Sequence, residues 1–152
     1  MKVAIGCDHA GISTKNALIP VLKELGIEWE DFGTATEESV DYPDFGEKVS
    51  AGVSKGNFER GILICGTGIG MSIVANKFSG VRAALCYDKY SAKMSRLHND
   101  ANVLVLPGRV VDKETVKEIV KIWFTTPFEG GRHRIRIDKI SAIEGKIKNA
   151  FK

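Results

Sequence analysis

The feature that most constrains the fold is a regular alternation of short apolar runs with longer segments of helical periodicity. Strands that alternate with helices are typical of a parallel sheet covered by helices on both faces. We therefore expect an α/β fold with five parallel strands. The apolar runs occupy residues 2–6, 27–32, 61–65, 81–86 and 102–107.

The segments between these runs predict helices, and the start and end of the first one can be argued from single residues. Ser13 or Thr14 could cap it and Gly26 would end it, whereas Pro20 should kink the helix or shift its start. Residues 34–44 form a polar loop. Helices are expected over 13–25, 43–55, 70–78, 88–97, 113–126 and 135–151.

Length and composition predict one soluble domain spanning residues 1–152, because 43% of the residues are hydrophobic and 27% are charged. No apolar window is long enough to predict a membrane span. The first residues read as a strand and not as a signal peptide. Three widely spaced cysteines without a CxxC pair favour reduced thiols and a cytoplasmic location.

The net charge of +3 is concentrated in the last segment, residues 132–152, which holds seven basic and two acidic residues. No aromatic residue is interleaved with its arginines, so a small anion fits better than nucleic acid. Arg132 and Arg136 are four apart and on a helix could clamp one phosphate, although an exposed basic face would look the same.

Polar residues follow several of the predicted strands. Asp8 and His9 come after the first, Cys65 ends the third, and Asp88 and Arg109 follow the fourth and fifth. Ligands of parallel sheets bind at the carboxyl ends of the strands. The sequence therefore predicts a binding site at this edge, with solvated turns as the alternative for Asp8 and His9.

The stretch "CGTGIG" places a glycine loop directly before a helix, where backbone N–H groups can face an anion. The spacing is GxGxG and not the full dinucleotide fingerprint, yet Asp88 lies where a ribose-binding acid would fall. A nicotinamide-binding module therefore stays an alternative. The loop consists of Gly66, Thr67, Gly68, Ile69 and Gly70.

Cys65 directly precedes this loop, so its thiolate form should be favoured and could act as a nucleophile or a base. The alternative is a buried cysteine at the end of a core strand, which is how we interpret Cys7 and Cys86. His98 and Asn99 add a second polar pair. No cluster has metal-ligand spacing and no Walker loop is present. This set suits proton transfer on a phosphorylated carbonyl compound without metal or organic cofactor.

Five blocks together identify a resemblance: "CDHAG", "SVDYPD", "CGTGIGMSI", "HNDANVLVLPGR" and "TPFEGGRHRIR" occur in that order between residues 7 and 136. The chain resembles the ribose-5-phosphate isomerase B family, which includes allose-6-phosphate and galactose-6-phosphate isomerases. The resemblance implies a Rossmann-like three-layer αβα sandwich. The tail beyond Arg136 follows no family motif, and we expect residues 132–152 to form a basic C-terminal helix that packs on a partner subunit. The resemblance further implies a homodimer with shared active sites, and leaves open whether dimers pair into tetramers.

The reaction implied by the resemblance interconverts ribose 5-phosphate and ribulose 5-phosphate through a cis-enediolate, a step of the pentose phosphate pathway. Cys65 would be the base, and the amides of residues 66–70 would stabilise the enediolate oxygen. His98 would assist ring opening, with Thr67 and Asp8. The remaining assignments are Asn99 and Tyr42 for the sugar, His9, Arg132 and Arg136 for the phosphate, and Arg109 for the partner's site.

Beside a pentose-phosphate isomerase and the nicotinamide-binding module, two further alternatives remain. The substrate of a hexose-6-phosphate isomerase of the same family would be longer by one CHOH group, and this difference is too small to read from the sequence. A sugar-phosphate-binding sensor would keep the glycine loop without the chemistry, but it would not need the thiol of Cys65.

Overall fold

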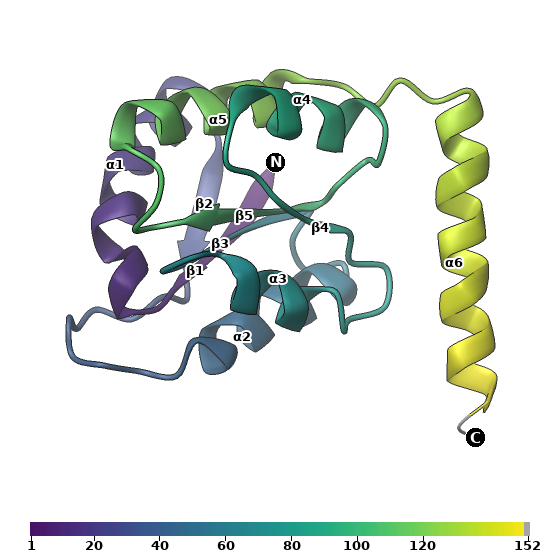
Figure 1. The fold of residues 1–152 in the computed structure, drawn as a ribbon, viewed down its shortest axis with the longest axis horizontal. Coiled ribbons are helices and arrows are strands. Elements are labelled where there is room, and N and C mark those ends of the chain that lie inside the picture. The colour runs from purple at the N-terminus through teal and green to yellow at the C-terminus, as the bar shows by residue number, and fades with distance from the viewer. Residues whose placement is uncertain (151–152) are drawn as a thin grey trace.

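The five predicted strands form one parallel sheet in the order β2-β1-β3-β5-β4 in the computed structural model, which describes residues 1–150 (Figure 1). Helices lie on both sides of the sheet, as the α/β prediction requires. The strands are β1 (Lys2–Cys7), β2 (Glu28–Asp31), β3 (Arg60–Cys65), β4 (Ala83–Leu85) and β5 (Val103–Pro107).

Every predicted helix is present, with boundaries that differ by a few residues. The last one begins earlier than the prediction, and its predicted final residue, Phe151, lies outside the described residues. The helices are α1 (Ile12–Glu24), α2 (Tyr42–Ser54), α3 (Ile69–Ala75), α4 (Lys89–Leu97), α5 (Lys113–Thr125) and α6 (Arg132–Ala150).

The start of α1 differs from the prediction, because neither Ser13 nor Thr14 caps it. A short 3-10 turn, η1 (His9–Gly11), precedes the helix, and Asp8 caps that turn by accepting the N–H of Ala10 at 3.0 Å. The Thr14 hydroxyl instead donates to the Gly108 carbonyl at 3.3 Å. An Asx-type turn therefore replaces the predicted Ser/Thr cap.

Pro20 lies inside α1 and does not shift its start. Proline removes one helical hydrogen bond, the one to the carbonyl four residues earlier, here that of Asn16. Both Pro20 and Asn16 are exposed, so water can satisfy this carbonyl.

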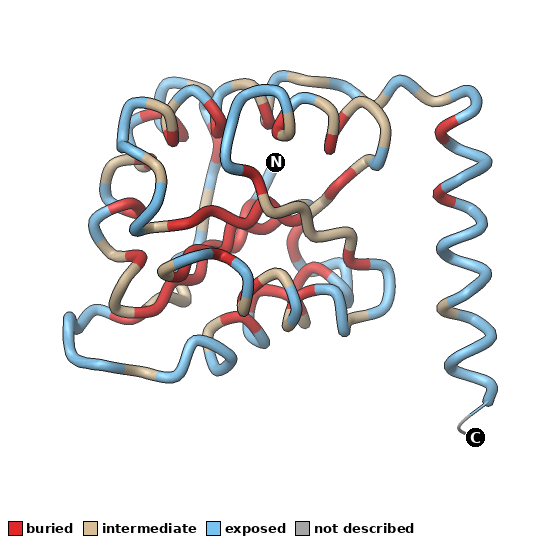
Figure 2. The backbone as a smooth tube through the Cα atoms, viewed as in Figure 1, coloured by how far each residue is buried: buried red, intermediate tan, exposed pale blue. Residues whose placement is uncertain are grey.

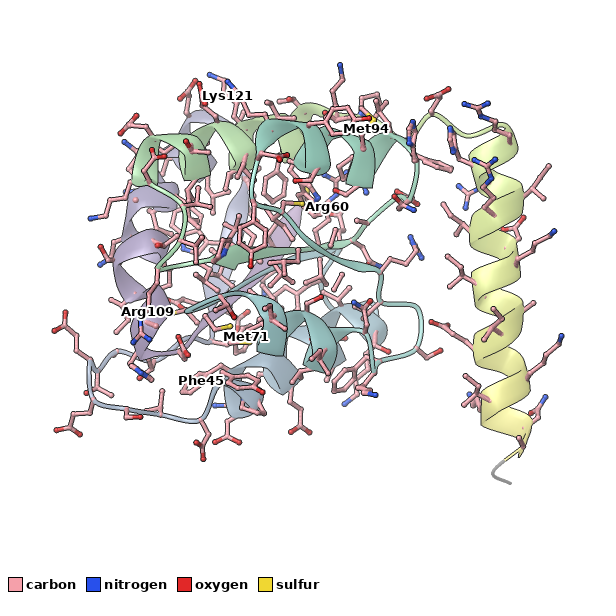
Figure 3. All side chains as sticks on the ribbon, in the orientation of Figure 1. Phe45, Arg60, Met71, Met94, Arg109 and Lys121 are labelled. Carbon is pink, nitrogen blue, oxygen red and sulfur yellow. The ribbon has the colours of Figure 1, made fainter. Side chains whose placement is uncertain are left out.

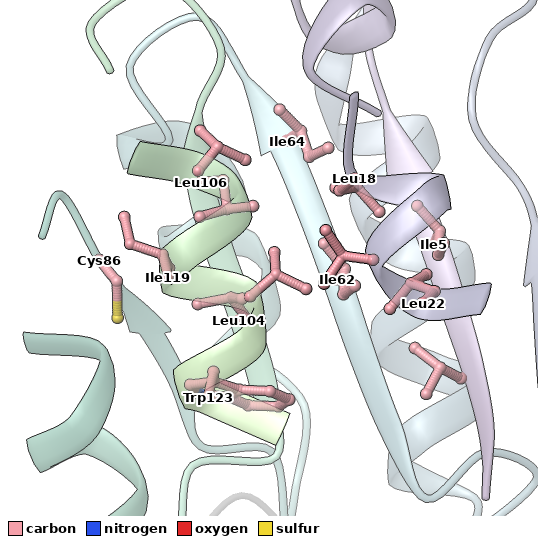
Figure 4. Packing of buried hydrophobic residues seen from close by; sticks show 14 of the residues in the cluster. Ile5, Leu18, Leu22, Ile62, Ile64, Cys86, Leu104, Leu106, Ile119 and Trp123 are labelled. Atoms are coloured by element: carbon pink, nitrogen blue, oxygen red, sulfur yellow. The ribbon is translucent and has the colours of Figure 1, made fainter. Parts of the chain in front are cut away.

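The core has two parts because successive strand residues point to opposite faces of the sheet. On β3, Ile62 and Ile64 pack with the cluster that includes α1 and α5, whereas Leu63 and Cys65 belong to the cluster under α2 and α3. Figure 4 shows the first cluster, in which Trp123 is fully buried. The buried strands are continuous apolar runs, as a sheet covered on both faces requires.

Helix α6 stands apart from the sheet (Figure 1), and most of its surface is exposed (Figure 2). Its buried residues are His133 and Ile137. Further along, the Glu144 carboxylate accepts the N–H of Gly80 at 3.0 Å and the Ser79 hydroxyl at 3.3 Å. Three isoleucines of the helix remain about half exposed: Ile140, Ile143 and Ile147.

Candidate functional site

The strand order reverses between β1 and β3, since the chain passes from β1 to β2 on one side and continues with β3 on the other. Ligands of open parallel sheets bind in the crevice at such a point, beyond the carboxyl ends of the strands. Asp8 follows β1 here and Cys65 ends β3. The N–H of Asp8 donates to the carbonyl of Ile64 at 3.2 Å, which holds the two strand ends side by side.

Cys65 lies at the centre of this edge, 4% exposed. Its carbonyl accepts the N–H of Gly108 at 2.8 Å, and the carbonyl of Gly66 accepts the N–H of Arg109 at 3.0 Å. These bonds bring Arg109 beside the glycine loop, and its side chain lies at the same end of the molecule in Figure 3, far from α6. A Cβ atom on Gly66 would lie 3.5 Å from Cδ of Arg109. The arginine therefore borders the loop that follows the cysteine.

The glycine loop turns sharply into α3 at Gly68, whose φ of 78° favours glycine. No side chain caps α3, although the Thr67 hydroxyl accepts the N–H of Ile69 at 3.3 Å. A Cβ atom on Gly70 would lie 2.5 Å from Cζ of Tyr42, so the tyrosine ring lies directly against this glycine. The helix after the loop thus has no side-chain cap, and an aromatic ring with a hydroxyl lies beside the loop.

Asp8 and His9 both have defined partners at this edge. Asp8 is 5% exposed and caps η1, so one of its oxygens already has a structural function. Nδ1 of His9 accepts the N–H of Val40 at 3.2 Å. Because Nδ1 is an acceptor, the neutral ring carries its proton on Nε2, which is then available as a donor.

Asp88 has a structural function, because one oxygen of its exposed carboxylate caps α4. Its carboxylate accepts the N–H of Ser91 at 2.7 Å, and these hydrogen bonds lower the pKa of the carboxyl group. The acid on which the nicotinamide alternative depended is therefore used by a helix terminus.

His98 and Asn99 lie at the opposite edge of the sheet. Helix α4 leads from the carboxyl edge back to the opposite edge, where β5 begins at Val103. His98 is the C-cap of this helix and therefore lies near the start of β5. Cys65 pairs with Pro107 at the far end of β5. The rise of a strand separates the two edges by about 13 Å over β5 alone.

His98 packs against the start of α6. The rings of His98 and His133 are stacked, with centroids 4.1 Å apart and an interplanar angle of 12°. Oε2 of Glu129 lies 3.9 Å from Nε2 of each histidine. Arg132 and Arg136 are exposed on the first turns of the same helix.

Sequence reasoning missed Glu129 and His133, and it expected no metal-ligand cluster. The structure brings His98, Glu129 and His133 together, with one possible ligand atom from each lying within 4.8 Å of the others. The four-residue spacing of Glu129 and His133 was a signal, but His98 joins them only through tertiary packing.

The predicted site residues thus form two groups that do not meet within one chain. At the carboxyl edge lie Asp8, His9, Tyr42, Cys65, Gly66, Thr67, Gly68, Ile69, Gly70 and Arg109. At the opposite edge and on α6 lie His98, Asn99, Arg132 and Arg136.

The other two cysteines are structural, as the sequence predicts. Cys7 is 0% and Cys86 is 1% exposed within the first core cluster. Burial raises the pKa of both thiols, that of Cys86 to about 11. No helix within residues 1–150 is long and apolar enough to cross a membrane.

A glycine loop without a side-chain cap follows a strand-end cysteine at the carboxyl edge of a parallel sheet, an arrangement typical of α/β proteins that bind small anionic metabolites. Comparison with known proteins gives the family. The model of the ribose/galactose isomerase family matches residues 3–140, and the chain belongs to this family.

Three similar proteins illustrate the range of the family. Ribose-5-phosphate isomerase B of Escherichia coli is 49% identical over 94% of this chain and 96% of that protein. D-erythrulose-4-phosphate isomerase of Pectobacterium atrosepticum is 41% identical over 98% of this chain and 99% of that protein. The structure of ribose-5-phosphate isomerase B from Clostridium thermocellum superposes with a TM-score of 0.93 at 52% identity, covering 97% of this chain and 99% of that one.

Proposed function

We propose that this protein interconverts ribose 5-phosphate and ribulose 5-phosphate, the reaction that the names of its E. coli and C. thermocellum relatives state. The observation that carries the proposal is the position of Cys65, at the end of β3 and directly before an uncapped glycine loop. A binding protein would need the loop alone, whereas an isomerase also needs a base beside it.

In the proposed reaction the Cys65 thiolate removes the proton from C2 of the open-chain aldose and returns it to C1, while a second proton passes from O2 to O1. The intermediate is a cis-enediolate. The N–H groups of residues 66–70 would stabilise its oxygen, as donors aimed at developing charge do. The absence of a capping side chain on α3 supports this assignment.

Ring opening is assigned to His98, assisted by Thr67 and Asp8, because the furanose needs a proton on its ring oxygen and loses one from O1. Asn99 and Tyr42 would orient the sugar hydroxyls. For the phosphate we propose the Nε2–H of His9 together with Arg132 and Arg136. Arg109 remains assigned to the partner's site.

These assignments require a homodimer, since Cys65 and His98 lie at opposite edges of one sheet. A two-fold axis that places the α6 edge of one chain against the carboxyl edge of its partner would complete two identical sites. The exposed isoleucines of α6 support this arrangement. Two of them, Ile140 and Ile143, border a groove of about 500 Å³ that Arg82, Ala84 and Asn99 also line.

The substrate alternatives are supported by the family itself, whose description includes galactose and one of whose members is named for a four-carbon phosphate. We infer further that residues 1–152 form one domain. The three free cysteines support a reducing compartment, which we take to be the cytoplasm, and the pathway would be the pentose phosphate pathway.

The test is kcat/KM on metal-stripped protein with ribose 5-phosphate, allose 6-phosphate, galactose 6-phosphate and erythrulose 4-phosphate. We expect the highest value for ribose 5-phosphate. A preference for another sugar would keep the mechanism and change the substrate. No turnover of any sugar, with thermal stabilisation by ribose 5-phosphate retained, would overturn the enzymatic proposal in favour of a sensor.

A further inference from the structure

We propose that His98, Glu129 and His133 form a binding site for a transition-metal dication such as Zn²⁺, and that its occupation inhibits the enzyme. The inhibitory part rests on the proposed function, because it depends on the ring-opening role of His98. The binding part does not.

The donor set is the first argument. Two imidazoles and one carboxylate are a common set of three protein ligands for zinc, and they leave a fourth position for water. Oε2 of Glu129 already lies 3.9 Å from Nε2 of His98 and from Nε2 of His133. Ligand atoms of a tetrahedral zinc site are about 3.4 Å apart, given bonds of about 2.0–2.1 Å. A movement of about half an ångström along each of these two contacts would bring Oε2 of Glu129 to that spacing from both imidazole nitrogens, and a turn of the His98 ring would complete the site.

His133 supplies an independent observation. The residue is 3% exposed, and its Nε2 is a buried polar atom without a hydrogen-bond partner among the described residues. Buried polar atoms of native proteins are nearly always satisfied, so an unpaired one next to a carboxylate calls for an explanation. A metal ion held between Nε2 of His133 and the Glu129 carboxylate would give the unpaired nitrogen a partner and neutralise the carboxylate.

Burial lowers the pKa of His133, and the neighbouring His98, Arg132 and Arg136 lower it further, while Glu129 opposes them. A lowered pKa favours the neutral imidazole, which is the form that binds metals.

The rings must leave their stacked arrangement to converge on one ion, and the structure allows this. The side chains of His98 and Glu129 are 37% and 55% exposed, so both can turn while the buried His133 stays in place. The positive charges of Arg132 and Arg136 oppose a cation, so the affinity should be lower than that of a structural zinc site.

Binding is tested by calorimetric titration of metal-stripped, reduced protein with Zn²⁺. We expect one ion per chain, and Glu129→Gln and His133→Asn should each weaken binding by about tenfold or more, as loss of metal-site groups does. Glu129→Gln changes an exposed side chain, so its result stands even where His133→Asn destabilises the fold. Wild-type affinity in both variants would overturn the site.

Two controls separate this cluster from other ligands. His9→Asn removes a histidine at the opposite edge, and Cys65→Ser removes the thiol of the proposed site. Both should bind Zn²⁺ as the wild type does. Loss of binding in Cys65→Ser would place the ion at the thiol and contradict the proposal.

Inhibition is measured separately, as turnover of ribose 5-phosphate with added Zn²⁺. Wild-type activity should fall as the ion binds and return with EDTA, and the Zn²⁺ concentration for half inhibition should rise about tenfold or more in Glu129→Gln. Calorimetric binding without inhibition would overturn the regulatory part. A protein without isomerase activity would still give the calorimetric result, so the two failures are distinguishable.

Discussion

Cys65 and His98 lie at opposite edges of the same parallel sheet, the first at the carboxyl end of β3 and the second just before β5 begins. A reaction that needs both residues therefore cannot take place within one chain. The shape of the fold, and not only the chemistry of the residues, is therefore the reason for proposing an active site shared by two subunits.

The role of Cys65 is tested by Cys65→Ser. Serine is isosteric but a far weaker base, so kcat should fall by on the order of 10²-fold or more, the usual contribution of a general base. Thermal stabilisation by ribose 5-phosphate should persist, because the loop amides and arginines are unchanged. A variant with wild-type kcat would show that another group moves the proton.

Replacement of His98 by asparagine should affect the two directions of the reaction differently. Ribose 5-phosphate is mainly furanose and needs ring opening, whereas ribulose 5-phosphate is already open-chain and its product can cyclise in solution. The initial rate from ribose 5-phosphate should therefore fall much more than the rate from ribulose 5-phosphate. Equal losses of kcat in both directions, measured at saturating substrate and corrected for the reaction equilibrium, would contradict the ring-opening role.

The three thiols should differ in their reaction with iodoacetamide. Burial raises the pKa of Cys86 to about 11 and raises that of Cys7, so both thiols stay protonated at neutral pH, whereas Cys65 lies directly before the glycine loop. Inactivation should track modification of Cys65, as measured by peptide mass spectrometry. Labelling of Cys86 should rise only as the pH approaches the pKa of its thiol. Inactivation that follows labelling of Cys7 or Cys86 at neutral pH would contradict the assignment of Cys65 as the reactive thiol.

The contact between Gly70 and Tyr42 predicts a binding defect. In Gly70→Ala the new Cβ would lie 2.5 Å from Cζ of Tyr42, so the ring must move. Tyr42 is 38% exposed and can do so without disturbing the core. KM should rise by about threefold to tenfold, the value of one neutral hydrogen bond, with a smaller change in kcat.

Gly145→Ala is the matched control for this variant, since nothing lies within 4 Å of a Cβ atom at Gly145. It should leave KM unchanged. If Gly70→Ala also leaves KM unchanged, Tyr42 does not orient the sugar.

The fold and the carboxyl-edge group could be predicted from the sequence because they follow from local rules. Cys65 and Gly70 belong to one contiguous strand-loop-helix segment, and parallel pairing brings Arg109 beside it. The start of α1 could not be predicted in this way, because the turn that Asp8 forms precedes the helix and replaces a cap by Ser13 or Thr14. The partnership of His98 with Glu129 and His133 depends on how α6 packs, which no local pattern reports.

The most direct test of the shared site is complementation between Cys65→Ser and His98→Asn chains. Each variant alone should be nearly inactive with ribose 5-phosphate. When the two are unfolded, mixed in equal amounts and refolded together, half of the dimers should contain both chains.

In such a mixed dimer one site combines both defects and the other has an intact Cys65 from one chain and an intact His98 from the other. Random pairing into two-fold dimers therefore predicts recovery of about a quarter of wild-type activity from ribose 5-phosphate. Refolded mixtures that contain mixed dimers, yet remain as inactive as either variant alone, would contradict a site built from two subunits.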